Sequence, residues 1–386
     1  MEDLLSVGIR ALRDKARTIA SDVLEPMADK VDSECLWPAH SLRALAEAGL
    51  TGLHIPRRLG GHEQGLLALA VLTETLAQAC SSSAICFGMH CVGSAVIAAK
   101  ATPDQDERYL RPIAEGRHLT TLALSETGTG SHFFFPQTAL TREGEVFIVD
   151  GNKQFVTNGG HIDSYVLSAQ ALEGAEDGEF SCLVLDADAP GLTWQEEWHG
   201  LGMRGNSSRG LSLRAARVPA TNLLGSQGDQ IWYVFEVVAP YFLISMSGTY
   251  LGIAQAALSI AQQHLRERRY AHSGERLANE PVLQHRLAEL WMAVEKTRGL
   301  IYQAARLADA GDENALTYVL SCKADVADTA VYVTNEAMTL CGGMAYRENS
   351  RLARLLRDAR AAHVMAPTTD ILKQWAGRAL LGLPLL

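Results

Sequence analysis

Small hydroxyl side chains and glycines crowd residues 122–140, LALSETGTGSHFFFPQTAL. Two runs of β-prone residues flank this segment, which predicts a loop between strands. A loop of this kind can bring several N–H and O–H donors to one ligand. Glycine loops are also ordinary turns, and the segment alone leaves both interpretations open.

A second candidate lies in residues 151–170, GNKQFVTNGGHIDSYVLSAQ. Phe155 and Thr157 are two residues apart, so on a strand their side chains share one face. An aromatic face beside a hydroxyl could hold a planar ring. The alternative is a core phenylalanine and a surface threonine. Two further segments contain unusual clusters of glycine and polar residues: residues 200–225 and 340–372.

The elements that must position these segments fall into three regions, which we expect to be domains. Residues 1–118 are predicted to be helical, because apolar residues recur every three or four positions from Leu5 to Met27. Residues 119–228 contain short β-rich runs separated by turn residues, which predicts a small β-barrel or sandwich. Residues 229–386 return to helical stripes with short links, which predicts an antiparallel bundle.

Local signals set several expected boundaries. Gly49 is predicted to end a helix that opens after Pro38. Asp150 and Gly151 separate two β-rich runs, which predicts a hairpin turn at this dipeptide.

Composition narrows the classes of function. The chain has 386 residues and a net charge of −10 with no basic run, so we do not expect nucleic acid as a partner. We expect no signal peptide and no membrane span, because no stretch looks long and apolar enough. The seven cysteines are scattered and odd in number, which favours free thiols and a cytoplasmic location. Cys86 and Cys91 flank His90, but no second ligand pair follows, so we expect no metal site.

The four candidate segments, in this order and spacing, resemble the acyl-CoA dehydrogenase family. SETGTGS, FVTNGG, RGNSSRG with VPATNLLG, and CGGMAY with RDAR and APT are similar to successive motifs of that family. The resemblance covers nearly the whole chain, including GLTGLHIPRRLGG near the start. It implies an N-terminal α-helical domain, a middle β-domain and a C-terminal four-helix bundle. It also implies FAD at their junction and assembly into a homodimer or homotetramer.

The resemblance assigns five residues to the cofactor of the same subunit. Ser125 would contact the flavin ring, and Ser131 would touch the flavin diphosphate or the pantetheine of the substrate. Phe155 would pack on the isoalloxazine, and Thr157 would hydrogen-bond near its N5 atom. Thr368 would lie against the FAD.

Other matching positions imply a neighbouring subunit. Arg268 would reach the FAD diphosphate of that neighbour, although Arg269 competes for this alignment. Gly342 and Gly343 would end a long helix and let the backbone approach the same cofactor closely. Arg357–Asp358 is expected to be structural, pairing within the bundle.

The departures from the family concern the catalytic base. Family dehydrogenases use a glutamate to take the α-proton of an acyl thioester, and it comes from one of two positions. Those positions are Ala366 and Phe242 in this chain, and an arginine that often follows the second is Leu243. General base catalysis typically contributes on the order of 10²–10⁴ in rate, so the loss is serious. The turn at Ala366 also donates a backbone N–H to the thioester oxygen in the family, and Ala366 retains that N–H.

Three side chains could replace the base. Asp370 lies one helical turn after Ala366, and Glu236 precedes Phe242 by about a turn and a half. Tyr241 adjoins the vacated position but would need a large fall in pKa. For each of them a solvated surface acid or a bundle tyrosine is the favoured interpretation. His132 replaces an acid of the family and precedes three phenylalanines that either line the acyl entrance or pack a barrel edge.

Three functions are therefore compatible with the sequence. The first is FAD-dependent oxidation of an acyl thioester, bound to CoA or a carrier protein, with a non-standard base. The second is a flavin monooxygenase or oxidase of the same superfamily, and the third is a catalytically silent flavoprotein subunit. The expected electron acceptor is an electron-transfer flavoprotein in the first case and oxygen in the second.

Overall fold

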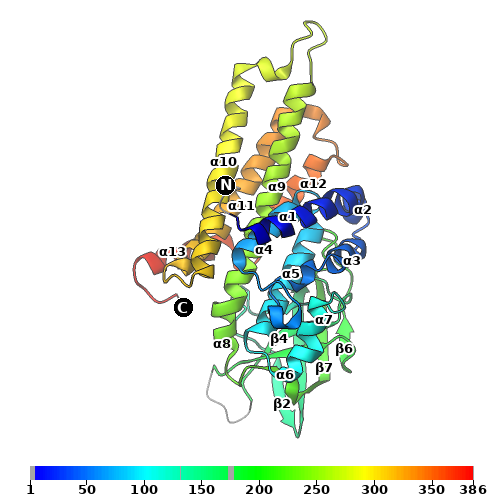
Figure 1. Ribbon diagram of the computed structural model, residues 1–386, viewed down its shortest axis with the longest axis vertical. Helices are drawn as coiled ribbons and strands as arrows, with labels where there is room; N and C mark the ends of the chain where they lie inside the picture. Colours follow the sequence, from blue (N-terminus) through cyan, green and yellow to red (C-terminus); the bar gives the residue numbers. More distant parts are fainter. Residues whose placement is uncertain (1–4, 131, 173–177, 386) are drawn as a thin grey trace.

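The structure, a computed structural model, describes residues 5–130, 132–172 and 178–385. Helices occupy both ends of the chain and strands occupy its middle, as expected. In Figure 1 the sheets lie at the bottom, and the link between α9 and α10 lies at the top. The fold therefore matches the predicted order of a helical, a β and a second helical region.

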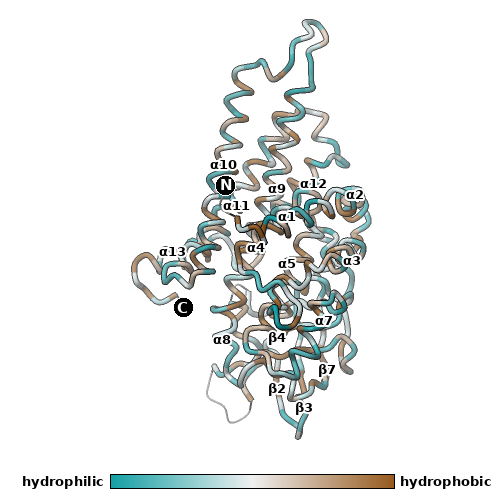
Figure 2. Tube along the Cα trace, in the orientation of Figure 1, coloured by the Kyte–Doolittle hydropathy of each residue, from teal (hydrophilic) through white to brown (hydrophobic). Residues whose placement is uncertain are grey.

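The N-terminal helices pack around two that are buried on all sides. Nearly every side chain of α4 and α5 is buried, and in Figure 2 the strongest hydrophobic colouring lies at α4, near the centre of the molecule. Gly49 has a left-handed backbone directly after α3, which confirms the predicted helix end. The helices are α1 Val7–Ile19, α2 Glu25–Ser33, α3 Ala39–Glu47, α4 Leu66–Ala77, α5 Ser81–Ala99, α6 Pro103–Gln105 and α7 Arg111–Ala114.

The middle region contains two four-stranded sheets around a shared apolar core. Their strand orders are β1-β4-β5-β8 and β2-β3-β7-β6, and only the β1–β4 pair is parallel. The core between them is closed by residues such as Phe147, Tyr165 and Leu211. The strands are β1 Thr120–Ala123, β2 Ala139–Glu143, β3 Val146–Val156, β4 Ser164–Ala169, β5 Ser181–Asp186, β6 Leu192–Trp194, β7 Arg209–Pro219 and β8 Leu223–Leu224.

The hairpin predicted at Asp150–Gly151 is wrong. Strand β3 runs straight through this dipeptide, and the turn before it lies at Gly144, whose φ is 62°. The Asp150 carboxylate accepts a hydrogen bond from the Ala215 N–H (2.7 Å), and the strand pairing shifts register here. A Cβ at Gly151 would lie 2.6 Å from the hydroxyl oxygen of Thr138. The dipeptide therefore serves a β-bulge and a close strand contact, which use the same residue types as a turn.

The C-terminal helices form an antiparallel bundle. Helix α9 packs against α4, α5, α10, α11 and α12, so it joins the bundle to the N-terminal helices. Helix α11 ends at Gly342, whose φ is 68°, as predicted. The helices are α8 Gln230–Trp232, α9 Ala239–Glu267, α10 Pro281–Asp309, α11 Ala315–Cys341, α12 Arg351–Val364 and α13 Thr369–Leu380.

Arg357 and Asp358 pair outside the bundle, contrary to expectation. The Arg357 guanidinium binds the Asp32 carboxylate of α2 and the Leu201 carbonyl (2.9 Å). The buried Asp358 carboxylate accepts hydrogen bonds from Ser81 and from the Met203 N–H (2.7 Å). The RDAR segment therefore ties α12 to both other regions.

Two helices are long and apolar enough to span a membrane by length and composition, contrary to the sequence expectation. They are Ser81–Ala99 and Gln230–Glu267. The protein interior buries 89% and 83% of their apolar windows, which is typical of core helices.

Candidate functional site

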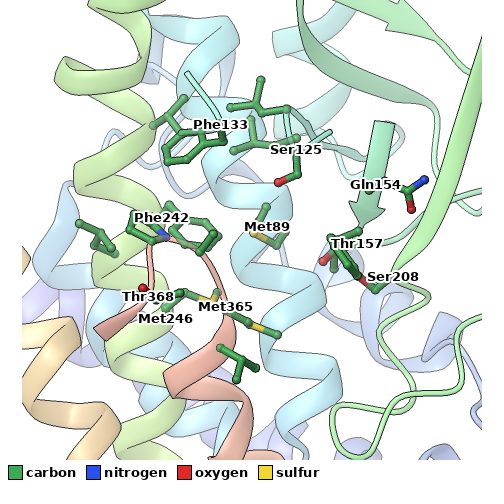
Figure 3. Close-up of a pocket in the computed structure, with 18 of the residues that line it drawn as sticks. Met89, Ser125, Phe133, Gln154, Thr157, Ser208, Phe242, Met246, Met365 and Thr368 are labelled. Atoms are coloured by element: carbon green, nitrogen blue, oxygen red, sulfur yellow. The ribbon is translucent and has the colours of Figure 1, made fainter. Parts of the chain in front are cut away.

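A cavity of about 790 Å³ lies where the sheets, α5, α9 and the turn between α12 and α13 meet. Ser125, Phe155, Thr157 and Thr368 all line it, so the fold gathers four of the predicted cofactor contacts. Figure 3 shows Ser125 and Thr157 on the side of the sheets, and Phe242, Thr368 and Met365 on the side of the helices. Segments more than 240 positions apart in the sequence thus share one chamber.

A backbone hydrogen bond joins the first two candidate segments. Ser125 follows β1, and its carbonyl accepts from the Gln154 N–H of β3 (2.8 Å). This bond holds the hydroxyl-rich loop beside the end of β3, where Phe155 and Thr157 lie. The loop position of Ser125 agrees with the sequence expectation.

Phe155 and Thr157 reach the cavity by a different route from the one predicted. Phe155 has a φ of 55°, and the β3–β7 pairing shifts between Lys153 and Val156, so simple alternation fails here. Phe155 is 64% exposed and meets Trp198 edge to face, at 6.2 Å between ring centroids. Thr157 is buried. The exposed ring beside the cavity offers an aromatic surface with little protein covering it.

The backbone around the cavity is strained at several residues. Besides Phe155, left-handed φ values occur at Asn158, Met203 and Ser207, none of which is glycine. The Asn158 amide accepts from the Trp37 indole N–H (2.9 Å) and donates to the Cys86 carbonyl (3.0 Å). Such strain persists only where surrounding contacts over-determine it, and it clusters at functional sites.

Two buried donors on the cavity wall have no acceptor among the described residues. They are the side-chain N–H groups of Asn206 and Trp198. The other amide atom of Asn206, Oδ1, is already bonded to the Ser208 N–H (3.0 Å), which fixes the side chain. A buried unpaired donor costs about 1–3 kcal/mol, so these two groups are suited to acceptors on a bound ligand.

Both family positions for the base line the cavity, and both are apolar. Ala366 lies on the turn after α12, and Phe242 lies in α9 with Leu243 beside it on the wall. The three replacement candidates are not among the lining residues. Glu236 and Asp370 are exposed, and burial raises the pKa of Tyr241 to about 12, which opposes a role as a base.

Glu126 is the one titratable group among the described residues that line the cavity. Its carboxylate accepts from the Lys153 ammonium (2.6 Å), from the Thr138 hydroxyl (2.7 Å) and from the backbone N–H of Gln137 (2.7 Å). Burial pushes the pKa of Glu126 upward, but these partners outweigh it and leave the pKa lowered. The carboxylate is thus committed to the fold and is a poor proton acceptor.

Aromatic side chains form the end of the cavity near α13. Phe133, Phe134, Phe235 and Trp375 line this end, and Phe134 packs between Phe235 and Trp375 at centroid distances of 5.7 and 6.3 Å. Phe133 and Phe134 therefore face the cavity, whereas Phe135 is exposed and does not line it. The first of the two interpretations of this run is favoured for two of its three phenylalanines. The aromatic rings at this end, which we call the distal wall, give the chamber a flat and apolar surface.

The remaining predicted contacts lie away from this chamber or cannot be placed. Arg268 follows α9 and is exposed, at the α9–α10 link at the top of Figure 1. Gly342 and Gly343 follow α11, and a Cβ at either would meet nothing within 4 Å. Their expected ligand belongs to a neighbouring subunit. Ser131 lies outside the described residues.

Comparison with known proteins supports the resemblance along the chain. The N-terminal, middle and C-terminal domains of acyl-CoA dehydrogenase match residues 8–117, 121–216 and 241–381. Cyclohex-1-ene-1-carbonyl-CoA dehydrogenase of Geobacter metallireducens is 32% identical over 369 residues, covering 95% of this chain and 96% of that protein. The chain belongs to the acyl-CoA dehydrogenase family. This family consists of flavoprotein oxidoreductases, so the chain is an enzyme of that class by descent.

Other relatives place the chain within the acyl-CoA dehydrogenases more broadly. Cyclohexane-1-carbonyl-CoA dehydrogenase of the same organism is 31% identical, covering 97% of this chain and 98% of that protein. The solved structure of butyryl-CoA dehydrogenase from Megasphaera elsdenii has a TM-score of 0.92 at 26% identity, covering 98% of this chain and 99% of that one. A prolyl acyl carrier protein oxidase shares the fold, with a TM-score of 0.86 at 22% identity, covering 97% of this chain and 99% of that one.

Sequence reasoning missed several residues of this cavity. Asn206, Trp198 and Met89 line the cavity but were not singled out. Asn206 lies within the polar run GNSSRG, which by itself indicates only a turn. Trp198 and Met89 carry no local signal, because a large apolar residue on a loop or helix is most often a core residue.

Proposed function

We propose that this protein is an FAD-dependent oxidoreductase that oxidises an acyl thioester, bound to CoA or to a carrier protein, between its α and β carbons. The observation that carries the proposal is the shared cavity, which is lined both by Phe155 and Thr157 at the end of β3 and by Ala366 and Thr368 after α12. A planar cofactor and a thioester both fit a chamber of about 790 Å³. We place the domain boundaries at 1–118, 119–228 and 229–386.

The residues present fit a flavin. The unpaired N–H groups of Asn206 and Trp198 suit the carbonyl oxygens and nitrogens at the edge of its ring system. Ser125, Phe155, Thr157 and Thr368 would hold the ring, while Ser131 would touch the diphosphate or the pantetheine of the substrate. When bound, FAD supplies the acceptor for the hydride that leaves the β-carbon. Arg268, Gly342 and Gly343 would serve the cofactor of a second subunit.

The turn after α12 provides the carbonyl-binding group. Ala366 lines the cavity, and its backbone N–H has no acceptor among the described residues. It can therefore donate to the thioester oxygen and stabilise the charge that develops there as the α-proton leaves. Pro367 has no N–H to offer, and it fixes the backbone that follows.

Among the described residues that line the cavity, no side chain is suited to take the α-proton. Ala366 and Phe242 cannot accept it, and Glu126 is held by Lys153. We propose that it passes to solvent, which makes the reaction slow for thioesters with ordinary α-protons. The preferred substrate would then have an α-proton that a neighbouring double bond or carbonyl already acidifies.

The distal wall favours a ring in the acyl group. Phe134, Phe235 and Trp375 present flat apolar surfaces there. Two relatives are named for cyclic acyl-CoA substrates, cyclohex-1-ene-1-carbonyl-CoA and cyclohexane-1-carbonyl-CoA. We therefore expect cyclic or aromatic acyl thioesters to bind more tightly than straight chains of equal carbon number.

The lack of a suitable base among the described lining residues also favours a second candidate. A flavin monooxygenase or oxidase could dispense with the glutamate and use oxygen as the electron acceptor. A catalytically silent subunit would retain FAD and react with neither a thioester nor oxygen.

Partners follow from the same proposal. An electron-transfer flavoprotein would accept the electrons in the dehydrogenase case. The exposed Val282, Trp291 and Met292 of α10 support a homodimer or homotetramer, because a second copy would cover them. All seven cysteines are free, which supports a cytoplasmic location.

An anaerobic titration tests the proposal. The purified protein is saturated with FAD, and acyl-CoAs with straight, cyclic and aromatic acyl groups are added without oxygen. Bleaching of the flavin absorbance by a cyclic thioester is the expected result. Protein that takes up no FAD would overturn the cofactor assignment. Flavin that stays oxidised with every thioester would move the assignment to oxygen chemistry or to the silent subunit.

A further inference from the structure

Lys323 of α11 is a fully buried lysine directly behind the turn that carries Ala366. Its ammonium donates to the carbonyl oxygens of Ala362 (2.8 Å), Met365 (3.0 Å) and Pro367 (2.8 Å). A lysine ammonium has three N–H donors, so all of them are satisfied. One side chain therefore holds the last turn of α12 and both sides of the Ala366–Pro367 linkage.

The charge of Lys323 is balanced differently from that of the other fully buried lysine. Lys153 is neutralised by Glu126 at 2.6 Å. Lys323 has no carboxylate within 4 Å among the described residues, and it rests on three carbonyl dipoles instead. Burial lowers the pKa of Lys323 to about 8, so the side chain is still largely cationic at neutral pH.

One of the three bonds involves the peptide that faces the substrate. The Met365 carbonyl and the Ala366 N–H belong to the same peptide unit. A cation hydrogen-bonded to the carbonyl end of a peptide withdraws electron density, and its N–H then becomes a stronger donor. The effect is largest where water is excluded, as it is behind this turn.

We propose that Lys323 is a positioning residue that fixes and polarises the Met365–Ala366 peptide, so that the Ala366 N–H binds the thioester carbonyl oxygen more strongly. This inference rests on the proposed function, because it takes the thioester as the ligand. Glu126, the one carboxylate among the described lining residues, is held by Lys153, so polarisation of the thioester carbonyl becomes the main way for these residues to acidify the α-carbon. Lys323 would supply part of that acidification without touching the substrate.

The test combines two variants with a charge control. Lys323→Met removes the charge and all three donors, whereas Lys323→Gln removes the charge but retains two N–H donors. Lys373→Met is the matched control, because Lys373 belongs to the same bundle but is exposed and pairs with Asp328 (2.9 Å). FAD content and thermal midpoint establish which variants are folded. If Lys323→Met does not fold, Lys323→Gln alone carries the test.

The first readout is the carbonyl stretching frequency of a bound, 13C-labelled acyl-CoA, measured by difference infrared spectroscopy. We expect the downward shift on binding to be large in the wild type and in Lys373→Met, and smaller in both Lys323 variants. The second readout is the rate of flavin reduction under saturating thioester. We expect it to fall about tenfold, with little change in KM, because a stronger donor acts mainly on the developing charge.

The possible outcomes distinguish a failure of the proposed function from a failure of the role proposed for Lys323. A wild-type carbonyl frequency that does not shift on binding would overturn the proposed function itself. A normal wild-type shift that a folded Lys323→Gln reproduces in full would overturn only the role of Lys323. A loss of FAD or of stability with an unchanged carbonyl shift would make Lys323 a structural residue and would also overturn this inference.

Discussion

Restoring the missing carboxylate is the most direct test of how the site is built. Ala366→Glu would place a base on the turn that lines the cavity, beside the N–H that binds the thioester oxygen. The chamber of about 790 Å³ has room for the longer side chain, and its wall includes the apolar residues Phe242, Leu243 and Met246. Desolvation by this wall would raise the pKa of the introduced carboxylate above the ordinary value of about 4.3 and towards neutrality.

The expected gain follows from the typical contribution of a general base. We expect the rate of anaerobic flavin reduction by an acyl-CoA to rise on the order of 10²–10⁴-fold, which corresponds to about 3–5 kcal/mol off the barrier. The gain should increase with pH as the carboxylate ionises. Stopped-flow absorbance at the flavin band measures it directly.

The control and the refuting result are both clear. Ala366→Gln has nearly the same shape and cannot accept a proton, so it should remain as slow as the wild type. Equal rates for the two variants would mean that side-chain size rather than basicity matters. A wild-type rate already as high as that of Ala366→Glu would refute the claim that the cavity lacks a working base.

Three further predictions concern buried polar groups. Replacing Lys153 by Met should destabilise the fold by about 3–5 kcal/mol in urea unfolding, because Glu126 would keep a buried charge without its partner; a loss below about 1 kcal/mol would contradict this. Asn206→Ala should weaken FAD binding roughly tenfold in a flavin fluorescence titration, the effect of one lost hydrogen bond, and unchanged affinity would show that its N–H does not face the cofactor. Burial lowers the pKa of His54 and of His90 to about 4, below the value in the unfolded chain, so both are neutral in the folded state. Stability should therefore be complete above about pH 6.5 and fall as the pH drops towards 4, by up to about 3 kcal/mol for each histidine; a flat urea-unfolding profile between pH 7 and 4.5 would disprove it.

Much of the fold could be predicted from the sequence because the signals that form and end a helix are local. The periodic apolar positions of the first and last regions, and the glycines Gly49 and Gly342, depend only on residues within a turn or two. The hairpin at Asp150–Gly151 failed because a bulge and a turn use the same residue types. The partner strand and Thr138, which are set by tertiary contacts, decided between them.

The sequence by itself also determined that neither family position for the base can act as one. Ala366 and Phe242 carry no titratable group in any conformation, so no folding of the chain can make either a base. The family motifs likewise fixed which segments would surround a flavin.

The tertiary structure decided which groups meet. Glu236 and Asp370 could have turned towards the cavity, and only the packing of the helices puts both at the surface. The unpaired donors of Asn206 and Trp198 and the lysine behind the turn emerge from contacts between distant segments. Local periodicity shows which residues are apolar or polar, but the neighbours that satisfy a polar atom, or leave it free for a ligand, are set by long-range packing.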